Sequence, residues 1–537
     1  MAATTPATAG PAAAAPIRAP CPRLNRVSFP CCRRRATPWW RPPRCSRKGK
    51  PVVTEEEAPP PRGPETQRTD DQDADSGALG RLRLDGVAAD IIGIAAPAVF
   101  ALAADPITAL VDTAFVGHIG SAELAAVGAS ASVFNLVSKL FNVPLLNVTT
   151  SFVAEQQALN DNSSNNTGQK APQEKGNHQR KVLPAVSTSL ALAAGIGLLE
   201  MVALIVGSGT LMNIIGIPVD SPMRAPAEQF LTFRAYGAPP IIVALAAQGA
   251  FRGFLDTKTP LYAVGAGNLL NVVLDAVLIF PLGLGVSGAA LATVSSEYLT
   301  AFILLWKLNN EVDLFSWNII GDGVIRYLKS GGLLIGRTIA VLLTLTLSTS
   351  LAAREGPVPM AGYEICLQIW LTISLLNDAL ALAGQALLAG EYAKGNYKQA
   401  RMVLYRILQV GDVTGVVLAA TLFIGFRSLS LLFTDDPAVL DVAQSGVWFV
   451  TISQPLNAIA FVADGLYYGV SDFAYAAYSM IFAGAVSSVF LLIAAPKFGL
   501  GGIWAGLTLF MSLRAIACFW RFGSKGGPWE IIWSESE

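Results

Sequence analysis

The chain has 537 residues, of which 53% are hydrophobic and 14% charged, and its formal net charge is zero. Soluble domains carry about 25% charged residues, so this composition, with a mean hydropathy of +0.49, indicates a membrane protein with many spans. A neutral chain gives no reason to expect nucleic acid as a partner. Two histidines and six cysteines without metal-ligand spacing argue against a metal centre or a catalytic triad. We therefore expect neither an enzyme nor a resident cofactor.

The N-terminal segment differs from the rest of the chain. Residues 1–50 contain eleven Lys or Arg and no acidic residue, whereas residues 55–85 are polar and acidic. The basic part lacks the apolar core of a secretory signal, and its Arg-rich, acid-free composition is typical of an organelle transit peptide. A polar cytosolic tail is the alternative. We predict that residues 1–85 are a transit peptide followed by a polar segment, and we favour a chloroplast membrane, in particular the envelope, over a mitochondrial one.

Twelve apolar segments follow, each near the roughly 20 residues that a membrane-spanning helix needs. They cover about 88–116, 122–155, 182–208, 226–253, 258–280, 286–308, 326–350, 360–390, 402–426, 438–468, 473–495 and 499–521. Lys and Arg concentrate in the loops that follow the even-numbered segments, which places both termini on the inner side of the membrane.

The second half of the chain repeats the first. GAFRGFLD at 249–256 matches GLYYGVSD at 465–472 with a shift of 216, and the same ungapped shift aligns GLG at 283–285 with GLG at 499–501. Because six spans is an even number, both copies cross the membrane in the same direction. The sequence therefore predicts an all-α membrane protein of two six-helix bundles around a central cleft. The predicted bundles cover 86–310 and 326–523, with a linker at 311–325 and a short polar tail at 524–537.

Charged side chains occur inside several predicted spans. A charge at the centre of a bilayer costs about 3 kcal/mol, so such residues should face the interior of the protein. The clearest cases are Asp105, Asp112, Asp275, Glu297, Arg337, Asp378, Asp412 and Asp464.

The fifth span carries the most informative pattern, GAGNLLNVVLDAVLIF at 265–280. Asn271 and Asp275 are four residues apart and share one helix face, and Asn268 adjoins that face. Amides beside a carboxylate can ligate Na⁺ or form a hydrogen-bond network for a proton. Asn side chains also join helices in membranes without any transport role, and the residues alone leave both interpretations open.

Three stretches resemble the multidrug and toxic compound extrusion (MATE) family: LVDTAFVGHIGSAELAAVG at 110–128, QGAFRGFLDTKTP at 248–260 and NLLNVVLDAVLIF at 268–280. The similarity extends over residues 86–523 and is closest to the bacterial DinF-like branch and its plant relatives, the plastid-targeted DETOXIFICATION proteins. The family's efflux of drugs and other small organic solutes implies a secondary transporter that exchanges H⁺ or Na⁺ for such a solute.

The resemblance also implies roles for single residues. Family motifs for an ion-coupling site in the N-terminal half match Asp112, Asn271, Asp275 and Thr293. Asp105 is as readily a packing carboxylate as a relay, and we keep Asp105, Glu297, Arg337 and Asp378 as candidates for a relay or for the solute. Arg337 can face an anionic solute or pair with an acid such as Asp378, and we favour the pairing. No metal other than Na⁺ is expected.

We therefore expect a monomeric antiporter that exports a small organic solute. Some plant relatives move citrate or aromatic carboxylates, which favours an organic anion. One alternative is a flippase for lipid or oligosaccharide intermediates, for which Arg337 and Lys139 would supply the cationic groove. Another is a membrane scaffold without transport, which would give Asp112, Asn271 and Asp275 no use.

Overall fold

The computed structural model of the chain describes residues 86–166, 183–215, 217–314, 322–434 and 436–534. This part of the chain is almost entirely α-helical. The helices are α1 Gly86–Gly117, α2 Ser121–Asn166, α3 Pro184–Ile215, α4 Arg224–Ala235, α5 Ala238–Gly253, α6 Lys258–Ile279, α7 Gly285–Glu311, α8 Asp322–Arg354, α9 Pro357–Ala393, α10 Tyr397–Ser430, α11 Pro437–Gly469, α12 Phe473–Phe498, α13 Leu500–Gly523 and α14 Pro528–Ser534. The predicted transit peptide lies outside the described residues.

Eleven of the described helices are long and apolar enough to cross a membrane, and the number becomes twelve when α4 and α5 are taken as one broken span. This confirms the prediction of an all-α protein with many spans. The sequence predicted a single span over 226–253, and the structure bends this span by 44° between α4 and α5. Pro239 and Pro240 lie at the start of α5. Proline lacks a backbone N–H, so it is tolerated in the first turn of a new helix and breaks a continuous one.

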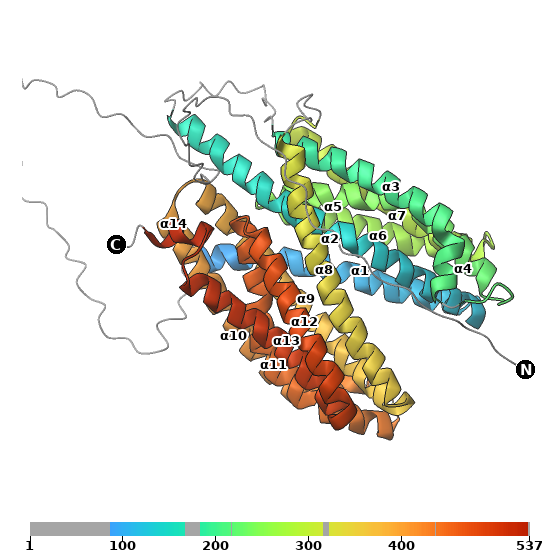
Figure 1. Cartoon of the computed structure of the whole chain (residues 1–537). Helices are drawn as coiled ribbons and strands as arrows, with labels where there is room; N and C mark the ends of the chain where they lie inside the picture. The colour runs from blue at the N-terminus through green and yellow to red at the C-terminus, as the bar shows by residue number, and fades with distance from the viewer. Residues whose placement is uncertain (1–85, 167–182, 216, 315–321, 435, 535–537) are drawn as a thin grey trace, which may run out of the picture. The chain divides into compact units, whose positions relative to one another are not determined.

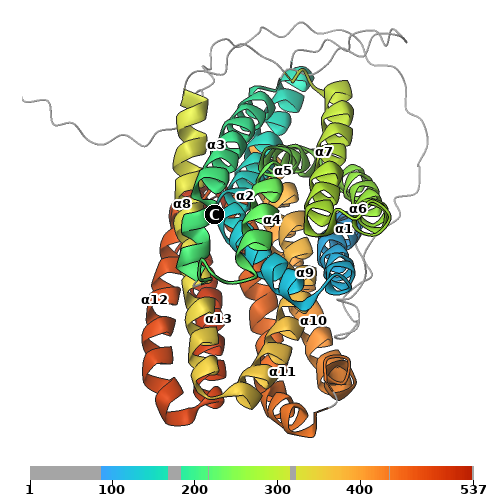
Figure 2. The same cartoon turned by 90° about the vertical axis from the view of Figure 1, so that its right-hand side faces the viewer.

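The helices form two groups that follow chain order. In Figures 1 and 2, α1 to α7 (blue to green) lie together, and α8 to α13 (yellow to red) lie together. In the first group α2 packs on α5 and α6 on α7, and in the second α9 packs on α11 and α8 on α12. The halves also share a core, because one buried cluster joins Ile91 of α1 and Val148 of α2 to residues of α9 and α11.

The predicted repeat is visible in the backbone. Leu255 and Ser471, which the shift of 216 relates, both adopt the left-handed conformation, with φ of 63° and 57°. The next N–H groups, of Asp256 and Asp472, donate to the carbonyl five residues earlier at 2.9 and 2.8 Å. Because non-glycine residues rarely adopt positive φ, this shared turn supports a common origin of the two halves.

Polar contacts of α2 also join the two groups of helices. Gln385 of α9 donates from Nε2 to Asn147 O and to Ser151 Oγ of α2, at 2.8 Å each. Arg326 of α8 forms an ion pair with Glu155 of α2 at 2.7 Å. Arg326 lies near the start of α8, at the side of the membrane that the basic loops predict to be the inner one.

The C-terminal segment, predicted as a short polar tail, contains the packed helix α14. Trp529 and Ile532 are completely buried. Trp529 Nε1 donates to Asp472 Oδ2 at 3.2 Å, and Arg521 Nε donates to the same oxygen at 2.8 Å. The tail is polar at both ends, but Trp529 and Ile532 are three residues apart, fall on one face of a helical turn and anchor it.

Candidate functional site

Three of the predicted site residues meet between α1 and α6. Asn271 and Asp275 are 1% and 0% exposed, and Asp112 is half-buried. With its amide nitrogen turned toward the carboxylates, Asn271 donates to Asp112 Oδ1 and to Asp275 Oδ2, at 3.2 Å each. The two carboxyl groups also lie within hydrogen-bonding reach of each other. We call Asp112, Asn271 and Asp275 the acid pocket.

An apolar layer closes one end of the acid pocket. Four residues beyond Asp112 and Asp275, Val116 and Ile279 pack in one buried cluster with Phe230 of α4 and Ala290 of α7. The layer therefore brings together helices α1, α4, α6 and α7. The layer shields the neighbouring carboxyl groups from water on that side. Electrostatic interactions are stronger away from water, where the dielectric constant is low.

Two further candidates of the first half, Asp105 and Thr293, make contacts outside the acid pocket. Asn268 donates from Nδ2 to Asp105 Oδ1 at 3.3 Å, so a second hydrogen bond joins α6 to α1 at these residues. The Asp105 side chain is exposed. The Thr293 hydroxyl donates to Ala289 O of its own helix at 2.9 Å, which leaves its oxygen free to accept or to ligate.

Two charged residues that the sequence interpretation overlooked lie in the same half. Arg234 of α4 forms a close ion pair with Glu297 of α7, and both side chains are about 15% exposed. Glu200 of α3 is 3% exposed and accepts a short hydrogen bond from the hydroxyl of Ser138. Both Arg234 and Glu200 stand inside apolar segments, so the rule that singled out Asp112 would also have found them.

A second charged cluster lies in the other half. Asp464 of α11 accepts hydrogen bonds from Arg337 of α8 and from Arg514 of α13, the latter at 2.6 Å. The predicted pairing of Arg337 with an internal acid therefore exists, but its partner is Asp464 and not Asp378. Arg337 and Asp464 are on different helices and are separated by 127 residues in the sequence. Residue spacing predicts contacts within one helix, so it could not identify this partner.

Asp378 of α9 is exposed and lies within electrostatic range of Arg252, Arg337 and Arg514. Arg252 belongs to α5 of the first half and is 7% exposed. Among the described residues its guanidinium makes no hydrogen bond or ion pair, and Asp378 is the acid that acts on it electrostatically. We call Arg252, Arg337 and Arg514 the arginine group. With Asp378 and Asp464 ionised, the group retains a net positive charge.

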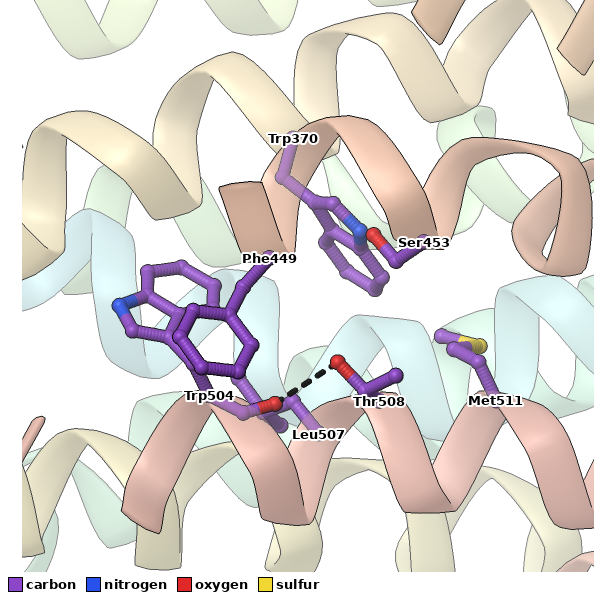
Figure 3. A pocket seen from close by; sticks show the side chains of 7 residues that line it. All are labelled: Trp370, Phe449, Ser453, Trp504, Leu507, Thr508 and Met511. Atoms are coloured by element: carbon purple, nitrogen blue, oxygen red, sulfur yellow. Dashed lines mark hydrogen bonds between the residues drawn. The ribbon is translucent and has the colours of Figure 1, made fainter. Parts of the chain in front are cut away.

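A small cavity opens within the second half, as Figure 3 shows. The empty space between its side chains is about 210 Å³, including its open side. The Thr508 hydroxyl, one of its few polar groups, is occupied by a hydrogen bond to Trp504 O at 2.9 Å. The wall is therefore mainly apolar and aromatic. It consists of Trp370, Phe449, Ser453, Trp504, Leu507, Thr508 and Met511.

Two matching halves of membrane helices, with separate charged clusters inside the spans, define a secondary transporter built from parallel repeats. The comparisons with known proteins agree with this class. The sequence pattern of the MatE family matches residues 170–277 and 334–493. DETOXIFICATION 44, a chloroplastic protein of Arabidopsis thaliana, is 65% identical over 83% of this chain and 84% of its own length. The chain therefore belongs to the MATE family of efflux transporters.

More distant relatives also match the chain over most of its length. The DNA damage-inducible protein F of Escherichia coli is 25% identical over 81% of this chain and 92% of its own length. A solved structure described as MATE in the bent conformation covers 84% of this chain and 97% of its own, with a TM-score of 0.74 and 19% identity. At that identity the likeness shows the fold, and the roles of single residues need their own argument.

Proposed function

We propose that the protein couples the entry of H⁺ or Na⁺ to the export of a small organic anion across a chloroplast membrane, the envelope being the favoured location. The observation that carries the proposal is the acid pocket. Two carboxylates bridged by an amide lie within membrane-spanning helices, and both Asn271 and Asp275 are buried.

The acid pocket is suited to reversible binding of a cation. Two neighbouring carboxylates repel each other when both are ionised, so the pocket is stable when it holds a proton or a metal cation. Asn271, donating from its nitrogen, stabilises the ionised carboxylates. If its amide turns over, Oδ1 faces the pocket and can ligate Na⁺ beside the hydroxyl oxygen of Thr293. The two orientations correspond to the two candidate ions.

The arginine group suits the anionic solute. Asp464 takes one hydrogen bond from Arg337 and one from Arg514, while the Nε atoms of both arginines have no partner among the described residues. Arg252 is buried without an ion pair in that part of the chain. Each guanidinium has five N–H donors in a planar arrangement that matches a carboxylate. Donors remain available for an anion that lies between the halves.

Coupling requires that the cation and the solute favour different conformations. In the proposed cycle, the cation in the acid pocket stabilises one arrangement of the two halves, and the anion at the arginine group stabilises the other. The contacts of α2 with Gln385 and Arg326 must open for the solute to enter from the inner side.

The test is uptake into proteoliposomes of the full chain without its transit segment. Radiolabelled citrate and benzoate serve as probes, first under an imposed pH gradient and then under a Na⁺ gradient. Accumulation of either anion that requires one gradient supports the proposal. Movement of labelled phospholipid between leaflets without anion uptake would instead identify a flippase, and the absence of both activities would favour a scaffold.

A further inference from the structure

The break between α4 and α5 carries a buried ion pair. Arg234 stands two residues before the break, and Gly237 lies within it. A side chain at Gly237 would collide with the carboxylate of Glu297 and with Arg234 Nη1. The backbone carbonyl of Tyr236 accepts a hydrogen bond from the hydroxyl of Tyr298 at 3.4 Å. Glycine at this point is therefore needed for the ion pair to lie directly against the bend.

Arg234 faces carboxylates from several helices. Besides Glu297 of α7, it lies within electrostatic range of Asp105 and Asp112 of α1 and of Glu200 of α3. Its guanidinium stacks on the ring of Phe134 of α2 at 4.3 Å, which keeps it away from bulk water. Arg234 is thus the cation shared by the carboxylates around the acid pocket.

The charges around Arg234 do not balance. Four carboxyl groups, those of Asp105, Asp112, Glu200 and Glu297, lie within electrostatic range of this one guanidinium, and a buried charge without a partner is costly. The hydrogen bonding of these carboxylates is also incomplete, because Glu297 Oε2 and Glu200 Oε2 have no hydrogen-bond partner among the described residues. A shift of the Arg234 side chain can therefore move positive charge from one carboxylate to another.

We propose that Arg234 is the resident counter-cation of the acid pocket. While H⁺ or Na⁺ occupies the pocket, Arg234 pairs with Glu297, as in this structure. When the cation leaves, the guanidinium moves toward Asp112 and neutralises the emptied pocket, and the break at Gly237 provides the freedom for this movement. The transported cation and Arg234 thus compete for the same carboxylates. The inference rests on the proposed function of the acid pocket.

The competing explanation is that Arg234 and Glu297 form a fixed pair that only stabilises the bend. The neutral double variant Arg234→Gln/Glu297→Gln separates the two, because it removes both charges without leaving either unpaired. The matched control is Arg224→Gln/Glu228→Gln, which removes an i,i+4 ion pair from the other end of the same helix. Thermal unfolding of both variants in detergent verifies that each is folded.

The measurement is direct binding of ²²Na⁺, and proton release recorded with a pH dye, on purified full-length protein, followed by gradient-driven uptake of the labelled anion. Without its competitor, the double variant should bind the coupling cation about tenfold more tightly, which corresponds to a preference of about 1.4 kcal/mol of the guanidinium for the emptied pocket. Its uptake should fall because the cation leaves slowly. Arg234→Lys, which keeps the charge, should restore most of the wild-type affinity.

Cation affinity and uptake at wild-type levels in the double variant would overturn the proposal and leave Arg234 a structural residue. The same conclusion follows if the Arg224/Glu228 control changes cation affinity as strongly. If the wild-type protein shows cation-independent uptake, the proposed function itself fails, and the role of Arg234 fails with it. The wild-type result thus distinguishes the two failures.

Discussion

Replacing Asp275 with Asn tests the acid pocket most directly. Asn keeps the volume of the side chain and can still accept a hydrogen bond from Asn271, but it cannot carry a charge. Asp275 is completely buried in α6, and its partners Asp112 and Asn271 remain in place. We expect Asp275→Asn, and likewise Asp112→Asn, to fold normally and to lose gradient-driven transport.

The structure sets the expected magnitudes. A charged side chain at mid-bilayer costs about 3 kcal/mol, so neutralising Asp275 should leave the free energy of unfolding unchanged or raise it. A contact with a charged group contributes about 1.5–3 kcal/mol, and each 1.4 kcal/mol corresponds to about a tenfold change in affinity. Losing one carboxylate should therefore weaken cation binding by roughly 10- to 100-fold.

The assay is anion accumulation in proteoliposomes, first under a pH gradient and then under a Na⁺ gradient, with thermal unfolding to verify folding. The control is Asp441→Asn, the same chemical change at an exposed position of α11, which should transport like the wild type. If Asp112→Asn and Asp275→Asn both concentrate the anion at the wild-type rate under either gradient, the acid pocket is structural and the reasoning is refuted.

Three further predictions concern other parts of the chain. Trp529→Ala should lower the free energy of unfolding by about 3–5 kcal/mol, since it empties a fully buried aromatic site; an unchanged unfolding temperature would contradict the packing of α14. Arg252→Gln should raise the KM for the anion by about tenfold with little effect on cation binding, whereas the exposed Arg354→Gln should change neither. Mass spectrometry of the protein from isolated chloroplasts should find a mature N-terminus between about residues 45 and 85, and an intact Met1 would disprove the transit peptide.

Much of this architecture follows from elementary patterns in the sequence. The length of the apolar segments predicted the spans, and the ungapped alignment of the two halves predicted the repeat. Both signals depend on local composition and spacing. The four-residue spacing of Asn271 and Asp275 placed both on one helix face, as the structure has them. Their proximity to Asp112 was implied by the family resemblance, since no spacing rule relates α1 to α6.

The rest depends on packing between distant helices. The partner of Arg337 is Asp464, and only the arrangement of α8 against α11 and α13 brings them together. The bend in the fourth span has a local signal in the sequence, Pro239-Pro240. Arg234 also carried a local signal, a charge inside an apolar segment, but its relation to Glu297 depends on how α4 crosses α7.

The repeat offers an internal comparison for the acid pocket. The shift of 216 relates Asn271 to Ser487 and Asp275 to Leu491. Ser487 and Leu491 are as completely buried in α12 as their counterparts are in α6. The same helical frame is therefore built in the second half with no carboxylate at this place, so the cost of burying Asp275 is not needed to hold the frame together.

The arginine group gives the converse case. The same shift relates Asp464 to Gln248 and Arg514 to Tyr298, so the first half builds the corresponding helices without this ion pair. Each half thus carries buried charge at positions where the other carries none: the acid pocket lies in the first half, and Arg337, Arg514 and Asp464 lie in the second. Coupling by linkage needs two distinct sites that bind different ligands. The acid pocket and the arginine group meet that requirement, with the cation proposed for the former and the anion for the latter, between the halves.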